Sequence, residues 1–144
     1  MAVTDHLAGD HSLVSYSALF TQTGGRLFLA HVEDQAVFDR YISVISKIPD
    51  LDTGIASEQI KARLLKDPND YVESCKDKLT EIFPTINIEH LVQLGCRMSD
   101  YQNLIDKHEI DLLVMYTKDD EQLAMHGVAY PLAVELRTTP LLML

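Results

Sequence analysis

Apolar residues along this chain gather in short runs of the length that β-strands have. Two of these runs, 27–32 and 112–116, are almost continuously apolar, which is typical of parallel strands covered on both faces. The run 86–94 alternates more, so we expect it nearer an edge of the sheet. The expected strands are 2–4, 27–32, 86–94, 112–116 and 141–144.

Between these runs, apolar residues recur every three or four positions, which indicates helices. A glycine pair at 24–25 ends the first of them, and Pro49 stops the second. Asp67 and Pro68 are expected to separate two helices, because aspartate caps a helix N-terminus and proline suits the first turn. Ser99 is the expected cap of a later helix. The expected helices cover about 11–23, 34–47, 55–66, 67–83, 99–105 and 129–137.

The resulting order, β-α-β-(α-α-α)-β-α-β-α-β, predicts a fold of the α/β class. Alternating strands and helices form a parallel sheet with helices on both faces, joined by right-handed crossovers, so we expect a three-layer, Rossmann-like architecture. The chain of 144 residues fits one domain, 1–144. Because the chain begins almost inside one strand and ends inside another, we expect a fragment of a longer protein.

The charge of the chain excludes some classes of partner. Asp and Glu number 22 against 12 Lys and Arg, a formal net charge of −10. Such a surface repels phosphate backbones and anionic lipid, which disfavours nucleic acid and membrane surfaces. The sequence holds no apolar run of the roughly 20 residues that a membrane helix needs, so we expect no direct membrane insertion. Two cysteines make no disulfide framework, and a cytoplasmic location is expected.

Candidate catalytic chemistry is sparse. Cys75 lies on an apolar helical stripe, whereas Cys96 follows Gly95 before a helix, where its thiol is either redox-sensing or inert. His6 and His11, with their neighbouring aspartates, are more consistent with a solvated loop than with a metal site, because zinc sites show tight Cys/His spacing. We find no Gly-x-Ser-x-Gly elbow. The expectation is a protein without enzyme activity and without a metal.

A series of segments resembles the universal stress protein family in order and spacing, over nearly the whole chain. The first strand closes on an aspartate, the second strand ends in His-Val, and a loop glycine leads through a helix to a last strand that begins with proline. The segments that carry the resemblance are Ala2–Asp5, His11-Ser12, Gly25–Val32, Gly95, Asp111–Met115 and Gly127–Leu144. The resemblance implies an open five-stranded parallel sheet of the adenine nucleotide alpha hydrolase-like type. Members of this family commonly form a homodimer by pairing their last strands, so the resemblance implies a homodimer through 141–144.

The loop that binds ATP in this family departs from the family pattern. ATP-binding members carry Gly-x-x-Gly, a spacer and then Gly-Ser or Gly-Thr, because glycine lets backbone N–H groups approach the phosphates. Here Tyr116 and Asp119 stand where the two glycines belong, and Val128 replaces the hydroxyl residue. The run 119–121 places three carboxylates where a triphosphate would lie. We therefore expect no ATP binding in the family manner.

Part of the adenosine side of the family cleft is retained. Asp5, Val32 and Met115 match positions that line the adenine and ribose pocket, although Val32 and Met115 are also ordinary core residues and Asp5 is also a loop cap. The remaining candidates around the cleft are Gly95, Thr117 and Gly127.

Two functions stay open. The first is a non-catalytic regulatory or interaction domain, dimeric, without a cofactor, that contacts a regulatory protein partner in the stress response. Its parent would be a tandem stress protein or a transporter. The alternative is a small-molecule sensor that binds AMP, ATP or a related adenine ligand in a remodelled cleft. The role of the helical segment 34–84 is undetermined by the sequence.

Overall fold

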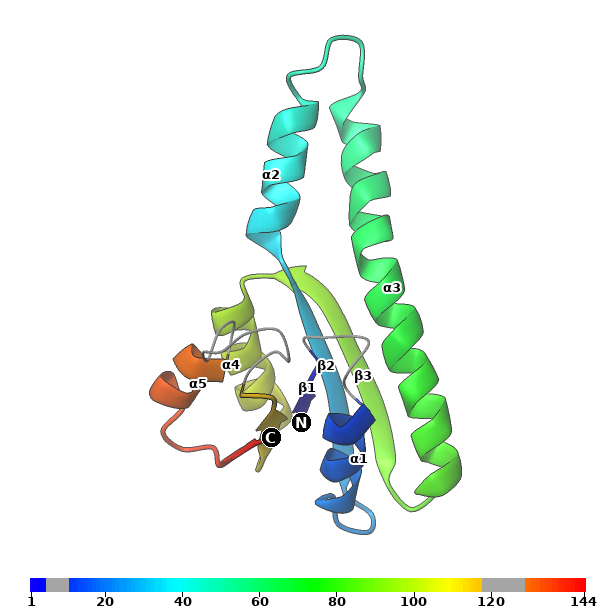
Figure 1. The fold of residues 1–144 in the computed structure, drawn as a ribbon, viewed down its shortest axis with the longest axis vertical. Helices are drawn as coiled ribbons and strands as arrows, with labels where there is room; N and C mark the ends of the chain where they lie inside the picture. The colour runs from blue at the N-terminus through cyan, green and yellow to red at the C-terminus, as the bar shows by residue number, and fades with distance from the viewer. Residues whose placement is uncertain (5–10, 118–128) are drawn as a thin grey trace.

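The computed structural model describes residues 1–4, 11–117 and 129–144. Strands and helices alternate along these residues, with two helices in succession between the second and third strands (Figure 1). The elements are β1 (Ala2–Val3), α1 (His11–Leu19), β2 (Arg26–Asp34), α2 (Gln35–Ile45), α3 (Thr53–Ile82), β3 (Asn87–Gly95), α4 (Arg97–His108), β4 (Leu113–Met115), α5 (Ala129–Glu135) and β5 (Leu141–Met143).

The five strands form one parallel sheet in the order β3-β2-β1-β4-β5, which confirms the predicted architecture. β1 lies at the centre, with Ala2 beside Leu29 of β2 on one side and beside Val114 of β4 on the other. β3 forms an edge, as its alternating pattern predicts. β5 forms the other edge and pairs only with β4 among the described strands.

The sheet has a hydrophobic core on each face, because successive side chains of a strand point to opposite sides. Phe28, Ala30 and Val32 of β2 belong to the core that includes residues of α4 and α5. Leu27 and Leu29, which alternate with them, belong to the core that includes residues of α1 and α3. The three layers that the sequence predicts are therefore present in the structure.

The predicted break at Asp67-Pro68 is wrong, because α3 runs as one helix through Pro68. Proline lacks the N–H that would bond the carbonyl of residue 64, a loss that tertiary packing overrides here. Pro68 is buried and begins the stripe that continues through Val72, Cys75 and Leu79. On the exposed surface, an ion pair between Lys66 and Asp70 spans the proline position, and another between Arg63 and Asp67 lies just before it.

Other helix ends differ from the predicted ones by a few residues. α1 ends at Leu19, and a turn leads from it to Gly24, whose φ of 77° is in the left-handed region that favours glycine. α4 starts at Arg97 with Cys96 at its N-cap position, two residues before the predicted start. Ser99, the predicted cap, donates its hydroxyl to the Cys96 carbonyl instead.

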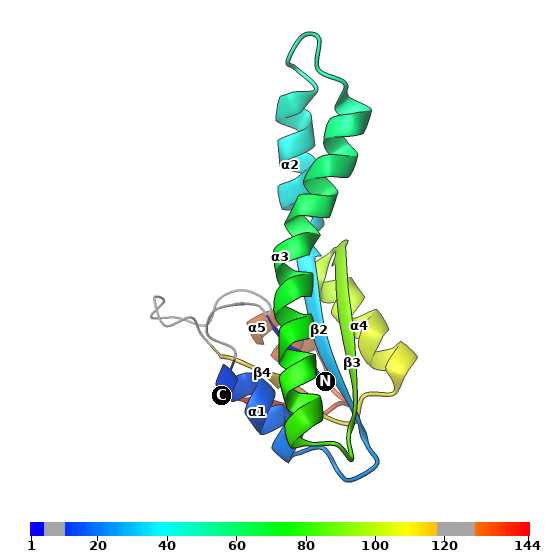
Figure 2. The same cartoon turned by 90° about the vertical axis from the view of Figure 1, so that its right-hand side faces the viewer.

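Part of the chain projects from the sheet as a helical hairpin (Figures 1 and 2). We call residues 35–66, which comprise α2, the connecting loop and the first half of α3, the arm, and the other described residues the body. Asp34 caps α2 by accepting from the Ala36 N–H, and Asp52 caps α3 by accepting from the N–H groups of Gly54 and Ile55. In the described ranges, no helix is both long enough and apolar enough to cross a membrane.

Candidate functional site

The strand order places a topological switch point at β1. The chain leaves β1 toward β2 on one side, while β4 lies on the other side, and open parallel sheets bind ligands in the crevice at the carboxyl ends of such strands. β1 ends at Val3, whereas β2 continues to Asp34. The backbone ladder between them ends with a hydrogen bond from the Thr4 N–H to the Ala30 carbonyl, at 2.9 Å.

Two side chains replace the next rung of this ladder. In a continued parallel ladder the Val32 N–H would donate to the Thr4 carbonyl, because amides two residues apart point to the same side of a strand. Here the Tyr101 hydroxyl accepts from the Val32 N–H at 3.1 Å, and the Thr4 carbonyl accepts from His31 Nδ1 at 2.5 Å. β1 and β2 therefore separate at their carboxyl ends, with a phenol and an imidazole between their polar groups.

Tyr101 closes the crevice on the α4 side. Its side chain is 0% exposed, and it belongs to the same core cluster as Val32. Leaving a buried N–H unpaired costs about 1–3 kcal/mol, so the hydroxyl contributes to stability where it stands. A ligand that used the Val32 N–H would first have to displace Tyr101.

His31 closes the crevice from the opposite face of the sheet. A carbonyl only accepts hydrogen bonds, so the contact with Thr4 requires that His31 Nδ1 carry a proton. The other ring nitrogen, Nε2, lies 3.2 Å from Glu33 Oε2. Both nitrogens of this buried ring are engaged within the protein, so His31 has a structural role here.

Tyr116 extends from the end of β4 to the first turn of α1. Its hydroxyl accepts from the Leu13 N–H at 3.1 Å. The first four N–H groups of a helix have no partner within it and form a ready site for an anion. One of these groups in α1 is therefore bound to the side chain that stands where the family has the first glycine of its phosphate loop.

The predicted site residues lie in three places. Val32 and Met115 are buried in one core cluster, so the structure brings them together, away from solvent. The Thr117 hydroxyl and N–H both donate to the Leu144 carbonyl at 3.0 Å, which ties the end of β4 to the end of β5. Gly95 lies on the edge strand β3, in register with Asp34.

Some of the predicted site residues lie outside the part of the chain that the structure describes. Asp5 and Gly127 lie outside the described residues, as do His6 and 118–126 of the loop. At Gly95 a Cβ would meet only the carboxylate end of the Asp100 side chain, which can shift, so packing alone does not require this glycine. The sequence does not identify Tyr101 or Glu33 as residues of the switch point. Tyr101 lies on an apolar helical stripe, which indicates a core position but gives no information on the partner of its hydroxyl.

Two hollows lie away from the switch point. One, of about 410 Å³, lies at the carboxyl ends of β2 and β3 and includes Asp34, Asp39 and Cys96 in its lining. The second, of about 340 Å³, lies at the amino ends of the strands and includes Met1 and Asp111. No group of three or more metal-binding side chains occurs among the described residues.

The Met1 amino group, which lies at the second hollow, has a shifted pKa. Its amino group donates to the Leu112 carbonyl at 2.7 Å. Burial lowers the pKa of this group from 8.0 to about 6, and the nearby Asp111 carboxylate partly opposes the shift. The consequence is a pH dependence of the stability of the body rather than a catalytic group.

Comparison with known proteins identifies the fold. No family model and no curated protein matches the sequence. Among solved structures, hypothetical protein MJ0577, the subject of a structure-based assignment of biochemical function, matches with a TM-score of 0.73 and 15% identity over 99% of this chain and 94% of its own. Hypothetical protein PH0823 matches with a TM-score of 0.68 and 13% identity over 99% and 90%. The described chain therefore has the α/β fold of the universal stress protein type.

Proposed function

We propose that this chain is a non-catalytic regulatory or interaction domain that does not bind ATP as ATP-binding universal stress proteins do. The observation that carries the proposal is the pair of tyrosines at the switch point. The Tyr116 hydroxyl caps an N–H of α1, and the Tyr101 hydroxyl accepts from the Val32 N–H. Each of these two backbone donors is therefore bound by one of the protein's own side chains.

Charge supports the same proposal. The chain carries a formal net charge of −10, which repels a triphosphate. At physiological salt this repulsion acts over a Debye length of about 8 Å. The loss of the glycine at position 116 also removes the close backbone approach that a phosphate needs.

Calorimetric titration with ATP and with AMP, each with and without Mg²⁺, tests the proposal. We expect no heat of binding up to about 1 mM ligand, which corresponds to less than about 4 kcal/mol of binding free energy. Micromolar ATP binding by the unchanged chain would overturn the proposal. Binding of AMP alone would favour the sensor function, with an adenosine pocket that has lost its phosphate site.

Two variants of Tyr116 separate the effect of the ring from that of the hydroxyl. Tyr116→Gly removes both and restores the glycine of the family loop, whereas Tyr116→Phe removes only the cap on Leu13. If the ring blocks the crevice, the glycine variant gains AMP affinity and the phenylalanine variant does not. Equal behaviour of the two variants would show that the ring is not what blocks the crevice.

A homodimer through the last strand is a further part of this proposal. Within the part of the chain that the structure describes, β5 has one strand neighbour, β4, and its Met143 is exposed, so its outer edge is available to another strand. Met143→Glu places a charge at this edge. Sedimentation of this variant tests whether β5 holds two copies together.

A further inference from the structure

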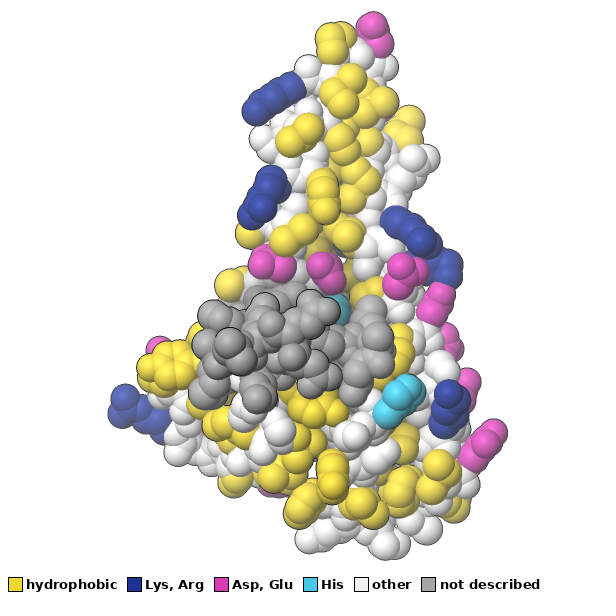
Figure 3. Space-filling model, in the orientation of Figure 1, with side chains coloured by type: hydrophobic (Ala, Val, Ile, Leu, Met, Phe, Trp, Pro, Cys, Tyr) yellow, Lys and Arg dark blue, Asp and Glu magenta, His cyan; other side chains and the backbone are white. Residues whose placement is uncertain are grey.

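The arm exposes a concentration of large apolar side chains. Tyr41, Val44, Ile48, Leu51 and Ile55 lie within fifteen consecutive residues and are each between 47% and 59% exposed. Figure 3 shows hydrophobic side chains extending along the arm from its base toward its tip. Exposed apolar patches of this kind mark interaction sites, because burying them against a partner is favourable.

α2 is apolar on two neighbouring sides, and among the described residues only one of these sides packs against another helix. The first side consists of Phe38, which is buried, with Ile42 and Ile45, which are half-buried, and α3 is the helix that packs on α2. The second side consists of Val37, Tyr41, Val44 and, in the following turn, Ile48. Their spacing of four, three and four residues is that of a coiled-coil seam.

A helix with two apolar sides is typical of a four-helix bundle, in which each helix packs against two others. The arm supplies two antiparallel helices, which is half of such a bundle (Figures 1 and 2). We propose that the arm docks on the arm of a second copy of this chain, antiparallel, so that four helices form a bundle with the two bodies at opposite ends. This inference stands independently of the proposed function.

The seam of α2 fits a second copy of itself. Its spacing reads the same in both directions, so antiparallel copies place Val37 opposite Ile48 and Tyr41 opposite Val44. A two-fold symmetric interface must be self-complementary in this way, because each surface meets its own copy. A seam with unequal spacing at its two ends would lack this property.

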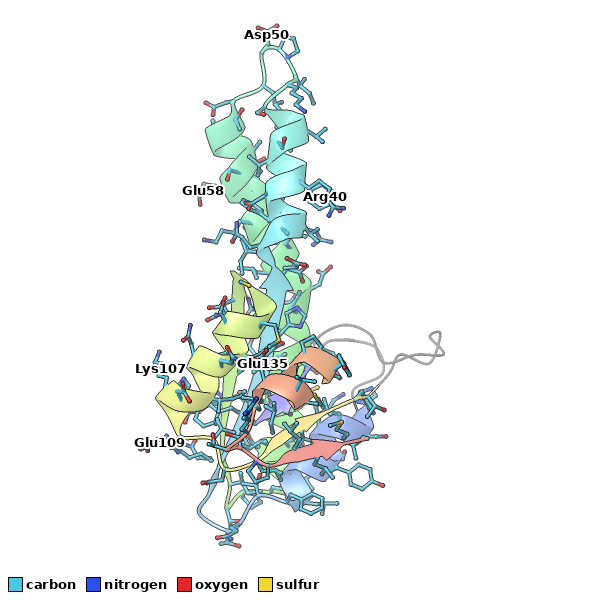
Figure 4. All side chains as sticks on the ribbon, turned by 90° about the vertical axis from the view of Figure 1, so that its left-hand side faces the viewer. Arg40, Asp50, Glu58, Lys107, Glu109 and Glu135 are labelled. Carbon is cyan, nitrogen blue, oxygen red and sulfur yellow. The ribbon has the colours of Figure 1, made fainter. Side chains whose placement is uncertain are left out.

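The charges of the arm change sign along its length. Toward the tip the arm carries Lys47, Asp50 and Asp52, a net charge of −1. Toward the body it carries Asp39, Lys61, Arg63 and Lys66, a net charge of +2, and Arg40 and Glu58 lie between the two groups (Figure 4 labels Asp50, Arg40 and Glu58). In an antiparallel pair the acidic tip of one arm lies beside the basic base of the other. A parallel pair would place like charges side by side.

The difference in net charge between the arm and the rest of the chain also favours antiparallel arms. The arm carries five basic and four acidic residues, a net charge of +1, while the other 112 residues carry seven basic and eighteen acidic ones, a net charge of −11. The fourteen residues of α3 in the arm span about 21 Å at about 1.5 Å per residue. Antiparallel arms therefore hold the two acidic bodies apart by more than two Debye lengths of about 8 Å.

The size of the contact predicts a moderate affinity. The arm offers a face about 20 Å long and two helix diameters of about 10 Å wide. This footprint of about 400 Å² is about half the 800 Å² per partner that stable interfaces average, which is typical of weak, transient contacts. We expect a dissociation constant in the micromolar range.

Sedimentation velocity of the whole chain tests the inference. The measurement uses a chain with Met143→Glu, in which pairing through β5 is blocked. Measured from about 1 µM to about 200 µM, the range that brackets a micromolar constant, this chain is expected to pass from monomer to dimer. Val44→Glu, added to the same chain, puts a charge at the centre of the seam and is expected to raise the dissociation constant at least 100-fold. A Met143→Glu chain that stays monomeric throughout, or one that still dimerises when Val44→Glu is added, overturns the inference.

Matched variants separate this contact from other causes. Leu19→Glu places the same charge on an exposed apolar position of α1, 67% exposed, and is expected to leave the dimer intact. Because Met143→Glu removes the β5 contact of the proposed homodimer, the dimer that remains in this variant is the one that the arm forms. An absence of any dimer in it would assign the association of the unchanged chain to β5. Unchanged far-ultraviolet circular dichroism and urea midpoints show that each variant is folded, and Ile55→Lys provides a second arm variant.

Zero-length carbodiimide cross-linking tests the orientation. In a mixture of light and heavy isotope-labelled chains, we expect mixed-isotope links between Lys61 or Lys66 of one copy and Asp50 or Asp52 of the other. Links from Lys47 at the tip to Asp50 or Asp52 of the other copy would show parallel arms. That result would overturn the antiparallel arrangement.

Discussion

The two halves of α3 have the same backbone and opposite surroundings. Residues 68–82 bury Pro68, Val72, Cys75 and Leu79 at helical spacing, whereas the described residues of α3 before Pro68 include no fully buried one. The first half is held by its N-cap at Asp52 and by contacts with α2. A long helix can therefore be part of a core at one end and a bare interaction surface at the other.

The largest expected effect separates the packed half from the arm. Leu79→Ala removes a side chain that is 5% exposed, and we expect a loss of about 3 kcal/mol in the free energy of unfolding. Ile55→Ala, in the first turn of the same helix, is expected to change it by less than about 0.5 kcal/mol. Urea unfolding at low protein concentration measures both. Equal losses would mean that the arm is as tightly packed as the body.

The second effect is a pH dependence that belongs to the body alone. The Met1 amine has a pKa of about 6 in the folded chain and 8.0 unfolded, so between these values the unfolded state binds more protons. This contribution to stability is complete above about pH 8 and is lost as the pH falls toward 6. Two pKa units correspond to at most about 2.7 kcal/mol.

The control for this pH dependence is a chain with an acetylated N-terminus, which keeps a donor N–H but has no amine to titrate. The free energy of unfolding of both chains is measured with urea from pH 6 to 8. Because both contain the same six histidines, the contribution of these residues cancels in the difference. A difference that does not vary with pH would contradict the prediction. The opposite slope would mean that the folded state favours the charged amine.

A third, smaller effect is confined to the arm. Asp52→Ala removes the side chain that accepts from Gly54 and Ile55, and N-cap losses cost about 1 kcal/mol. We expect amide exchange in the first turns of α3 to rise about fivefold while the urea midpoint of the body stays unchanged. Glu58→Ala, on the same helix, is the control. A shift of the midpoint would show that the arm and the body unfold together.

The smallest effect concerns the passage of α3 through Pro68. The Arg63–Asp67 and Lys66–Asp70 pairs are exposed, and such pairs contribute about 0.3–0.5 kcal/mol each. Replacing both aspartates by alanine is expected to lower helicity around residue 68 slightly, and 1 M salt should reproduce the loss in the unchanged chain. A loss that salt does not reproduce would point to packing instead of charge.

The sequence predicts the sheet well, because its information is local. Continuous apolar runs such as 27–32 need only burial on both faces to become parallel strands, and they do so here. The helix break at Asp67-Pro68 fails for the opposite reason. Whether a proline interrupts a helix depends on what its ring packs against, and Pro68 is buried in the tertiary structure.

The candidate site is predicted only in part. Tyr116 is identified because its position is compared with a glycine, but the sequence does not show that its hydroxyl reaches Leu13. Tyr101 is 69 residues from Val32 in the chain, and no local pattern links a helix tyrosine to a strand amide. The separation of β1 from β2 is a property of the assembled sheet.

The continuity of α3 has a mechanical consequence. Thirty residues at about 1.5 Å each make a rod about 45 Å long, of which one half is anchored in the body and the other half lies in the arm. Such a rod acts as a lever: a tilt of about 5° in the anchored half moves the far end by about 2 Å. A force on the tip is transmitted in the same way to the anchored half of α3, which packs against β2 and β3.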